Sequence, residues 1–157
     1  MQMFLLRWRF AMQNEAMWAS MQSRGAILDR GLPGDRVFAQ LHARRGNMHE
    51  LEWLTYEQWF DTMACALRPP AVLLYLDTAP EVALERTRTR GREAESSIPL
   101  EYLQALADGY NELIEEIVAG RHAWSQGIRV VRVPWNDGPD VTPILQILES
   151  VAPGMLS

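Results

Sequence analysis

The sequence predicts an α/β protein built on a parallel sheet. The short and continuous apolar run at 71–76 is typical of a strand that is buried on both faces, and residues 128–133 are a second predicted strand. The longer stretches around them carry apolar residues at helical spacing. This alternation is typical of parallel strands joined by helices. The chain has 157 residues without a repeat or a linker, which predicts a single domain over 1–157.

The first half of the chain predicts three helices and one strand. No proline or glycine interrupts the first helical pattern before Gly25. A short apolar run then leads into a turn at 31–34, and Asp35 stands where an N-cap would open the next helix. Two consecutive prolines end the third helix. These elements are a helix over 2–23, a strand at 26–30, a helix over 36–44 and a helix over 49–67.

The second half predicts two strands with helices between and after them. Thr78 is a candidate cap for an arginine-rich helix, and Gly91 breaks or bends that helix. Pro99 begins a long helix. These elements are a strand at 71–76, a helix from 80, a helix over 99–119, a strand at 128–133, a polar loop at 135–140 and a helix over 141–151.

Composition narrows the class of protein. The net charge of −5 disfavours nonspecific nucleic-acid binding by the whole surface. The single Cys65 cannot form an internal disulfide and fits a reducing compartment. No apolar run approaches the roughly 20 residues that span a bilayer, and the start of the chain lacks a cleavable signal pattern. We therefore expect a cytoplasmic protein without a membrane or nucleic-acid partner.

Four arginines at every second position, Arg86, Arg88, Arg90 and Arg92, concentrate positive charge in this acidic chain. Guanidinium groups bind phosphate in a planar fork, so an anionic ligand is the functional interpretation. In a regular helix Arg86 and Arg90 share one stripe and the other two share another, so all four cannot meet one ligand. The alternative is a solvated charged helix. The chain holds no lysine, so it cannot contain a complete Gly-Lys-Ser/Thr phosphate loop.

Polar residues elsewhere form two further candidate sites. Asp29 and Arg30 end the expected strand at 26–30, where a carboxylate can hold Mg²⁺ and an arginine can neutralise phosphate. A strand-terminal salt bridge or turn is an equal alternative. Gln2, Arg9 and Gln13 share one helix face and could read the edge of a nucleobase. From spacing alone, a solvated polar face is the favoured interpretation of that stripe. The three histidines lack the spacing of a metal site.

Six short motifs follow one another at 28–31, 34–39, 75–76, 80–86, 90–95 and 98–103. Together they resemble the deoxynucleoside kinase family, which includes the deoxycytidine, deoxyguanosine and deoxyadenosine kinases. The resemblance covers nearly the whole chain. It implies a P-loop-kinase-like fold, a three-layer parallel sheet with helices on both faces. It also implies transfer of the γ-phosphoryl group of ATP, with Mg²⁺, to the 5′-hydroxyl of a deoxynucleoside, here a purine deoxynucleoside or deoxycytidine.

The resemblance also assigns roles to single positions. Gln2 would hydrogen-bond the base, and the pair Arg9 and Asp35 would read it. Asp29 and Arg30 would lie near Mg²⁺ and the phosphates, with Asp29 as the metal ligand. The remaining roles are Arg86, Arg90 and Arg92 as lid arginines over the ATP phosphates, Glu95 near the sugar 3′-hydroxyl, and the 135–140 loop with Asp137 at the adenine of ATP.

The sequence departs from the family pattern in three places. Gly31 replaces the usual serine after the Asp-Arg pair, and Ala94 replaces an acid of the lid. The family's first strand, its phosphate loop and the glutamate that acts as general base have no counterpart in these residues. We therefore expect an N-terminally truncated kinase domain that is inactive alone, and two strands that lack a ladder partner.

Three functions stay open at this point. The first is the kinase, which the family's helix-mediated contact predicts to be a homodimer. The second is a noncatalytic nucleotide-binding or regulatory fragment that oligomerises or complements another chain. The third is an arginine-helix RNA binder, which the net negative charge makes the weakest.

Overall fold

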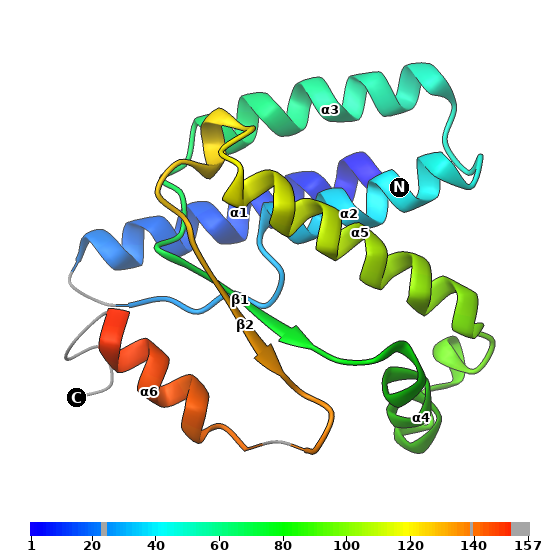
Figure 1. Cartoon of the computed structure of the whole chain (residues 1–157). Helices are drawn as coiled ribbons and strands as arrows, with labels where there is room; N and C mark the ends of the chain where they lie inside the picture. Colours follow the sequence, from blue (N-terminus) through cyan, green and yellow to red (C-terminus); the bar gives the residue numbers. More distant parts are fainter. Residues whose placement is uncertain (23–24, 139, 152–157) are drawn as a thin grey trace.

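The computed structural model describes residues 1–22, 25–138 and 140–151, and Figure 1 shows their arrangement. Strand β1 (Val72–Asp77) pairs in parallel with β2 (Arg129–Pro134), with Val72 opposite Arg129 and Asp77 opposite Pro134. A parallel pair needs a long crossover, and the helices between the two strands supply it. The predicted α/β class and both of these strands are confirmed.

The helices also follow the predicted order. In Figure 1, α1, α2, α3 and α5 lie together on one side of the strand pair, and α6 lies on the other side. Helix α4 begins directly after β1 and carries the arginine-rich segment. The bounds are α1 (Gln2–Met21), α2 (Leu32–Arg44), α3 (Glu50–Cys65), α4 (Pro80–Arg90), α5 (Leu100–Val118) and α6 (Thr142–Val151), with short 3-10 turns η1 (Glu93–Glu95) and η2 (Ala123–Ser125).

The strand expected at 26–30 does not form. Residues 25–28 have no regular secondary structure, and the side chain of Ile27 is 77% exposed. A strand is stable only when a neighbour satisfies its backbone N–H and C=O groups. Among the described residues the sheet contains β1 and β2 alone, so the segment at 26–30 has no ladder partner.

Two predicted caps are also wrong. Asp35 lies inside α2, because that helix begins at Leu32 and has a proline in its first turn. Proline suits this place, since its fixed φ is helical and its missing N–H would have no helical partner. Thr78 does not cap α4 either. The N-cap of α4 is Ala79, and the Ala79 N–H donates to Oδ1 of Asn136 at 2.9 Å.

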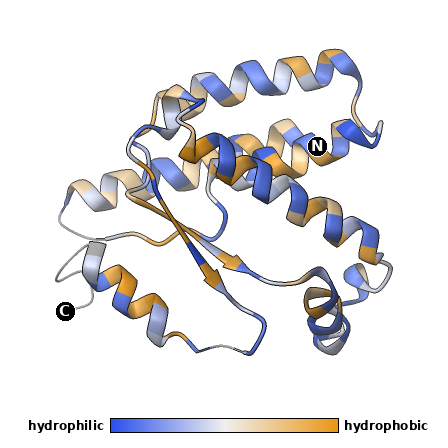
Figure 2. Ribbon diagram, viewed as in Figure 1, coloured by the Kyte–Doolittle hydropathy of each residue, from blue (hydrophilic) through white to orange (hydrophobic). Residues whose placement is uncertain are grey.

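The core lies between the helices and one face of the strand pair. Tyr56 and Phe60 of α3 and Leu6 of α1 are completely buried, and Trp124 of η2 packs edge-on against Phe60. Leu73 of β1 joins the same cluster. Figure 2 shows hydrophobic segments along both strands, and hydrophobic and hydrophilic segments alternating along the helices. None of the helices in the described ranges is long and apolar enough to cross a membrane.

Helix α4 ends where the sequence predicts. Gly91 adopts a left-handed conformation with φ of 66°, and its N–H bonds back to the carbonyls of Arg88 and Thr87. Glycine adopts this conformation without the steric cost that a Cβ would add. The chain therefore leaves helical geometry between Arg90 and Arg92, which changes where the arginines point.

Candidate active site

Asp35 is the centre of the first candidate site. Its residue is only 6% exposed, and its Oδ2 accepts a hydrogen bond of 2.8 Å from the hydroxyl of Tyr56. Burial raises the pKa of Asp35, while the Tyr56 hydrogen bond and the nearby charges of Arg9 and Arg30 oppose that rise. The structure therefore brings together the Arg9 and Asp35 that the resemblance pairs, and adds Arg30 beside them.

Arg9 connects α1 to the segment before α2. Its Nη1 donates to the backbone carbonyl of Asp29 at 2.8 Å. The polar stripe on which Arg9 lies is not solvated, because Gln2 and Gln13 are 8% and 9% exposed. The solvated-face interpretation of that stripe is therefore wrong.

The two glutamines of the stripe differ in their contacts. Oε1 of Gln13 accepts the backbone N–H of Leu32 at 3.0 Å, which satisfies an otherwise unpaired donor at the start of α2. A Cβ at Gly31 would lie 2.8 Å from the same oxygen, so a serine there would disturb this bond. Gln13 is therefore a capping residue, and Gly31 has a structural reason to lack a side chain.

Gln2 lies at the other end of α1. Its Oε1 is buried without a hydrogen-bond partner among the described residues, which is costly unless something pairs with it. Gln2 lines a hollow of about 390 Å³ beside His42, Met48 and Glu52. Arg9 and Asp35 do not line that hollow. A base contact for Gln2 stays a prediction.

Arg30 has an unusual backbone conformation. Its φ is 60°, whereas every other described residue with positive φ is a glycine. Such strain clusters at functional sites when the surroundings hold it in place. The Arg30 guanidinium lies 4.4 Å from the centre of the Phe38 ring, and a Cβ at Gly34 would come within 3.0 Å of Arg30 Cγ and 3.3 Å of the Tyr110 hydroxyl. Glycine at position 34 therefore allows Arg30 and Tyr110 to approach α2 closely.

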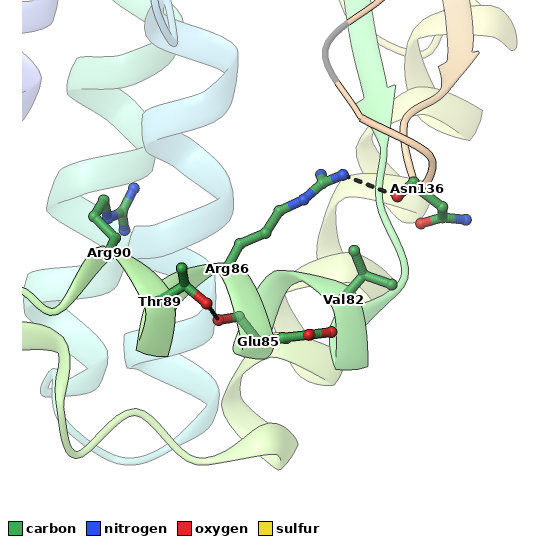
Figure 3. Close-up of a pocket in the computed structure, with 6 residues that line it drawn as sticks. All are labelled: Val82, Glu85, Arg86, Thr89, Arg90 and Asn136. Carbon is green, nitrogen blue, oxygen red and sulfur yellow. Dashed lines mark hydrogen bonds between the residues drawn. The ribbon is translucent and has the colours of Figure 1, made fainter.

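Arg86 binds the loop that follows β2. Its Nη1 donates to the carbonyl of Trp135 at 2.8 Å and its Nη2 to the carbonyl of Asn136 at 3.0 Å. Figure 3 shows the Arg86 side chain reaching from α4 toward Asn136. These contacts border a hollow of about 450 Å³. Its lining residues are Val82, Glu85, Arg86, Thr89, Arg90 and Asn136.

Arg90 and Arg92 both pair with Glu95. Arg90 Nε donates to Oε2 of Glu95 at 3.1 Å and its Nη2 also bonds this oxygen, while Arg92 Nη1 lies 3.4 Å from Oε1. The hydrogen bond from Arg90 is the main reason that the pKa of Glu95 falls below its usual value. The turn at Gly91 allows this convergence, which a continuous helix would not. The Arg88 side chain is exposed.

Comparisons with known proteins identify the family of the chain. A sequence model of the deoxynucleoside kinase family matches residues 1–138. The chain belongs to the deoxynucleoside kinase family. Deoxyadenosine kinase of Dictyostelium discoideum is 32% identical over 150 residues, which cover 96% of this chain and 57% of that protein. Deoxyguanosine kinase of the same organism is 32% identical over 146 residues, 92% of this chain and 49% of that protein.

A solved structure supports the fold. Deoxyadenosine kinase from M. mycoides, solved with bound dCTP, superposes with a TM-score of 0.71 at 20% sequence identity. The match covers 96% of this chain and 75% of that one. The chain spans about half the length of the curated relatives it matches. The resemblance noted in the sequence is thus confirmed at the level of family and fold.

A kinase of this family implies ATP, with Mg²⁺ as an expected companion. Asp29 has an exposed side chain next to Arg30 and fits as one ligand, since protein-bound Mg²⁺ is held by one or two carboxylates together with phosphates and water. The described residues contain no group of three or more carboxylates, histidines or cysteines that could hold a metal by themselves. Asp137 lies in the exposed loop beside Asn136, outside the lining of the Arg86 hollow.

The sequence patterns missed two residues of the site. Tyr56 is 21 positions from its partner Asp35, and no local spacing marks that bond. Asn136 lies within the expected polar loop, but its contacts with Ala79 and Arg86 depend on how β1 and β2 pair. Long-range packing, and not motif spacing, places both residues.

Proposed function

We propose that this chain carries the base-reading face and the lid of a deoxynucleoside kinase, whose reaction transfers the γ-phosphoryl group of ATP to the 5′-hydroxyl of a purine deoxynucleoside or deoxycytidine. The observation that carries the proposal is the buried carboxylate of Asp35 with Arg9 and Arg30 beside it. A buried, hydrogen-bonded carboxylate flanked by two arginines is a typical perturbed group of a functional site. The whole of 1–157 acts as one domain in this proposal.

On the nucleoside side, Asp35 offers an acceptor to a base. An ionised carboxylate can only accept hydrogen bonds, so it favours bases that present an exocyclic amino group. Arg30, the second arginine beside Asp35, lies over the ring of Phe38 and can bind a phosphoryl group near Asp29. Gln2 has an unpaired buried oxygen that suits a further donor of the ligand.

On the donor side, the hollow between α4 and the 135–136 loop would receive the adenine of ATP. ATP with Mg²⁺, when bound, supplies the transferable phosphoryl group. The residues of the chain that would neutralise the phosphate charge are Arg90 and Arg92, which both pair with Glu95 in the structure. Each guanidinium that turns to phosphate frees part of the Glu95 carboxylate for the sugar 3′-hydroxyl.

Binding and turnover test the proposal separately. We expect the 157-residue chain to bind deoxyadenosine or deoxycytidine in a calorimeter, and the Asp35→Asn variant to bind them at least about tenfold more weakly. The 157 residues hold no lysine and no phosphate loop, so we expect no phosphorylation with ATP. Absence of any nucleoside binding would refute the base-reading role. Robust turnover would refute the requirement for a phosphate-loop lysine.

The lack of lysine favours a second candidate, a nucleotide-binding fragment that complements another chain. This candidate also predicts binding without turnover. It differs in a mixing experiment, because a second chain that carries a phosphate loop would restore phosphorylation and would co-elute with this one. The two candidates therefore share the nucleoside site and differ in what completes it.

The expected homodimer has a candidate surface. Large apolar side chains of α1 and α3 are exposed on helices that pack against each other. Burying such a patch removes apolar area from water, which is the usual driving force for association. Light scattering should give about twice 18.0 kDa for the wild type, and Trp8→Glu should shift the protein to monomer. The exposed residues are Phe4 66%, Trp8 53%, Trp18 56%, Leu51 67%, Leu54 46% and Trp59 51%.

A further inference from the structure

We propose that Tyr56 is a positioning residue that fixes the carboxylate of Asp35 in one orientation and thereby makes the site selective for bases with an exocyclic amino group. The inference rests on the proposed function, because Asp35 is there the group that reads the base. Tyr56 itself would not touch the nucleoside.

The contact between the two side chains is direct and buried. The Tyr56 hydroxyl donates to Oδ2 of Asp35 at 2.8 Å, and the two residues are 0% and 6% exposed. Oδ1 of Asp35 has no hydrogen bond in the part of the chain that the structure describes. One oxygen is therefore committed to α3, and the other is available to a ligand as an acceptor.

The Tyr56 ring is itself held in place. It stacks on Trp53 at 5.7 Å between ring centres and on Phe60 at 6.3 Å, both within α3. One residue further along each helix, Arg36 of α2 pairs with Glu57 of α3 at 3.4 Å. Two consecutive polar bridges thus fix the register of α2 against α3. Because the Tyr56 ring is held between its neighbours, its hydroxyl stays in one place and fixes the orientation of the Asp35 carboxylate.

The direction of the hydrogen bond decides the chemistry. Burial raises the pKa of Tyr56 far above its usual value, so its hydroxyl keeps the proton and remains a donor. A donor on Oδ2 favours the ionised form of Asp35, whose free oxygen can then only accept. A protonated Asp35 could instead donate to a base carbonyl. Removal of the Tyr56 hydroxyl should therefore weaken the preference for amino-bearing bases.

The two charges that act on Asp35, besides its hydrogen bond with Tyr56, work in the same direction. Arg9 and Arg30 both favour the ionised carboxylate by their positive charge. They are unchanged in a Tyr56→Phe variant, so a change in that variant reports the hydroxyl. The titratable and charged groups by element are Arg9 of α1, Arg30 before α2, Arg36 within α2, Tyr56 and Glu57 of α3, and Tyr110 and Glu116 of α5.

The experiment compares the wild type with Tyr56→Phe, Asp35→Asn and the double variant. Binding of deoxyadenosine and deoxycytidine is measured by calorimetry against deoxyinosine and deoxyuridine, which carry a carbonyl in place of the amino group. We expect Tyr56→Phe to lower the preference for the amino-bearing partner by about five- to tenfold. Combined with Asp35→Asn it should have no further effect, because the hydroxyl acts only through that carboxylate. Tyr102→Phe, at a half-buried tyrosine of α5 remote in sequence from Asp35, is the matched control.

A second readout does not depend on nucleoside binding. A carbon-13 NMR titration follows the Asp35 carboxyl group in the wild type and in Tyr56→Phe. We expect its pKa to be higher in the variant, with the same folded spectrum. An unchanged pKa, or an unchanged base preference in a protein that binds nucleosides, would overturn the positioning role. A raised pKa in a chain that binds no nucleoside would keep the role of Tyr56 and reject the kinase site instead.

Discussion

The carboxylates of Asp35 and Glu95 both lie beside arginines, but their surroundings are opposite. Asp35 is buried in the helical layer, where burial raises its pKa and a tyrosine holds one oxygen. Glu95 lies after α4 in a partly exposed turn, where the hydrogen bond from Arg90 lowers its pKa. The first group is fixed by packing before a ligand arrives. The second is held by ion pairs that a charged ligand can exchange.

In the proposed kinase, this difference would suit two separate tasks, recognition of a base and neutralisation of phosphate. A base is discriminated best by polar groups that are already oriented and dry. Phosphate charge, in contrast, can be met by long side chains that change partners at little cost, because exposed ion pairs contribute little to stability. Substitutions in the buried region should therefore lower the free energy of unfolding more than substitutions in the exposed turn. Substitutions in either region can weaken ligand binding.

The largest effect is expected in the buried region. Tyr56→Ala removes a fully buried ring and leaves Asp35 without its donor. By analogy with other large-to-small core substitutions, the free energy of unfolding should fall by about 3–5 kcal/mol. Urea denaturation measures this value. Tyr102→Ala at the more exposed surface of α5 serves as control, and an equal loss there would contradict the assignment of the core.

A smaller effect is expected where α2, α5 and the segment before η2 meet. Oε2 of Glu116 is shared by Arg36 at 3.0 Å and by Nε2 of His122 at 3.0 Å. Burial alone would raise the pKa of Glu116, but the His122 hydrogen bond and the charge of Arg36 outweigh it, so the pKa is lowered. Glu116→Gln should cost about 1–2 kcal/mol near neutral pH.

The same substitution has a defined pH dependence. A carboxyl group whose pKa is lower in the folded state stabilises the fold above its unfolded pKa, and this contribution is lost as the pH falls through the folded value. The difference between wild type and Glu116→Gln should therefore shrink below about pH 4.5, the ordinary value of a glutamate. Thermal unfolding across pH 3 to 7 measures it, and a constant difference would speak against the ion pairs.

The turn at Gly91 should show an intermediate effect on stability. Nothing lies within 4 Å of the position that a Cβ would occupy, so Gly91→Ala introduces backbone strain and no clash. A left-handed conformation costs a residue with a Cβ roughly 1–2 kcal/mol. Asparagine tolerates this conformation better, so Gly91→Asn should retain more stability in the same denaturation experiment. Equal losses for the two variants would show that φ is not the cause.

The smallest effect on stability is expected for Arg92→Ala. The Arg92 side chain is 65% exposed and its contact with Glu95 is 3.4 Å long. We therefore expect no measurable change in melting temperature, but weaker binding of ATP by calorimetry. A lower melting temperature with unchanged ATP binding would show that Arg92 is a structural residue and not part of a lid.

The sequence predicted the elements whose signals are local. The strands at 71–76 and 128–133, the helix at 49–67 and the break at Gly91 all appear within one or two residues of their expected bounds. The prediction of a strand at 26–30 was wrong because an apolar run indicates that a segment is buried, and does not indicate whether a neighbouring strand is present to pair with it. Asp35 failed as a cap for a related reason, since Gln13, far away in the sequence, caps α2 in its place.

The candidate site divides in the same way. Motifs single out Asp29, Arg30, Asp35 and the arginine series, because these residue types suit phosphate and base chemistry at short spacing. They do not reveal which guanidinium bonds a carbonyl and which bonds a carboxylate. That depends on the turn at Gly91 and on the pairing of β1 with β2.

The two kinds of arginine contact should respond differently to ionic strength. Arg86 donates to two uncharged backbone carbonyls, whereas Arg90 and Arg92 share an anion. Added salt shortens the screening length to about 3 Å at 1 M, which weakens attraction between exposed opposite charges far more than a hydrogen bond to a neutral oxygen. Concentrated salt would thus loosen the segment after Gly91 while α4 stays attached to the loop at 135–136.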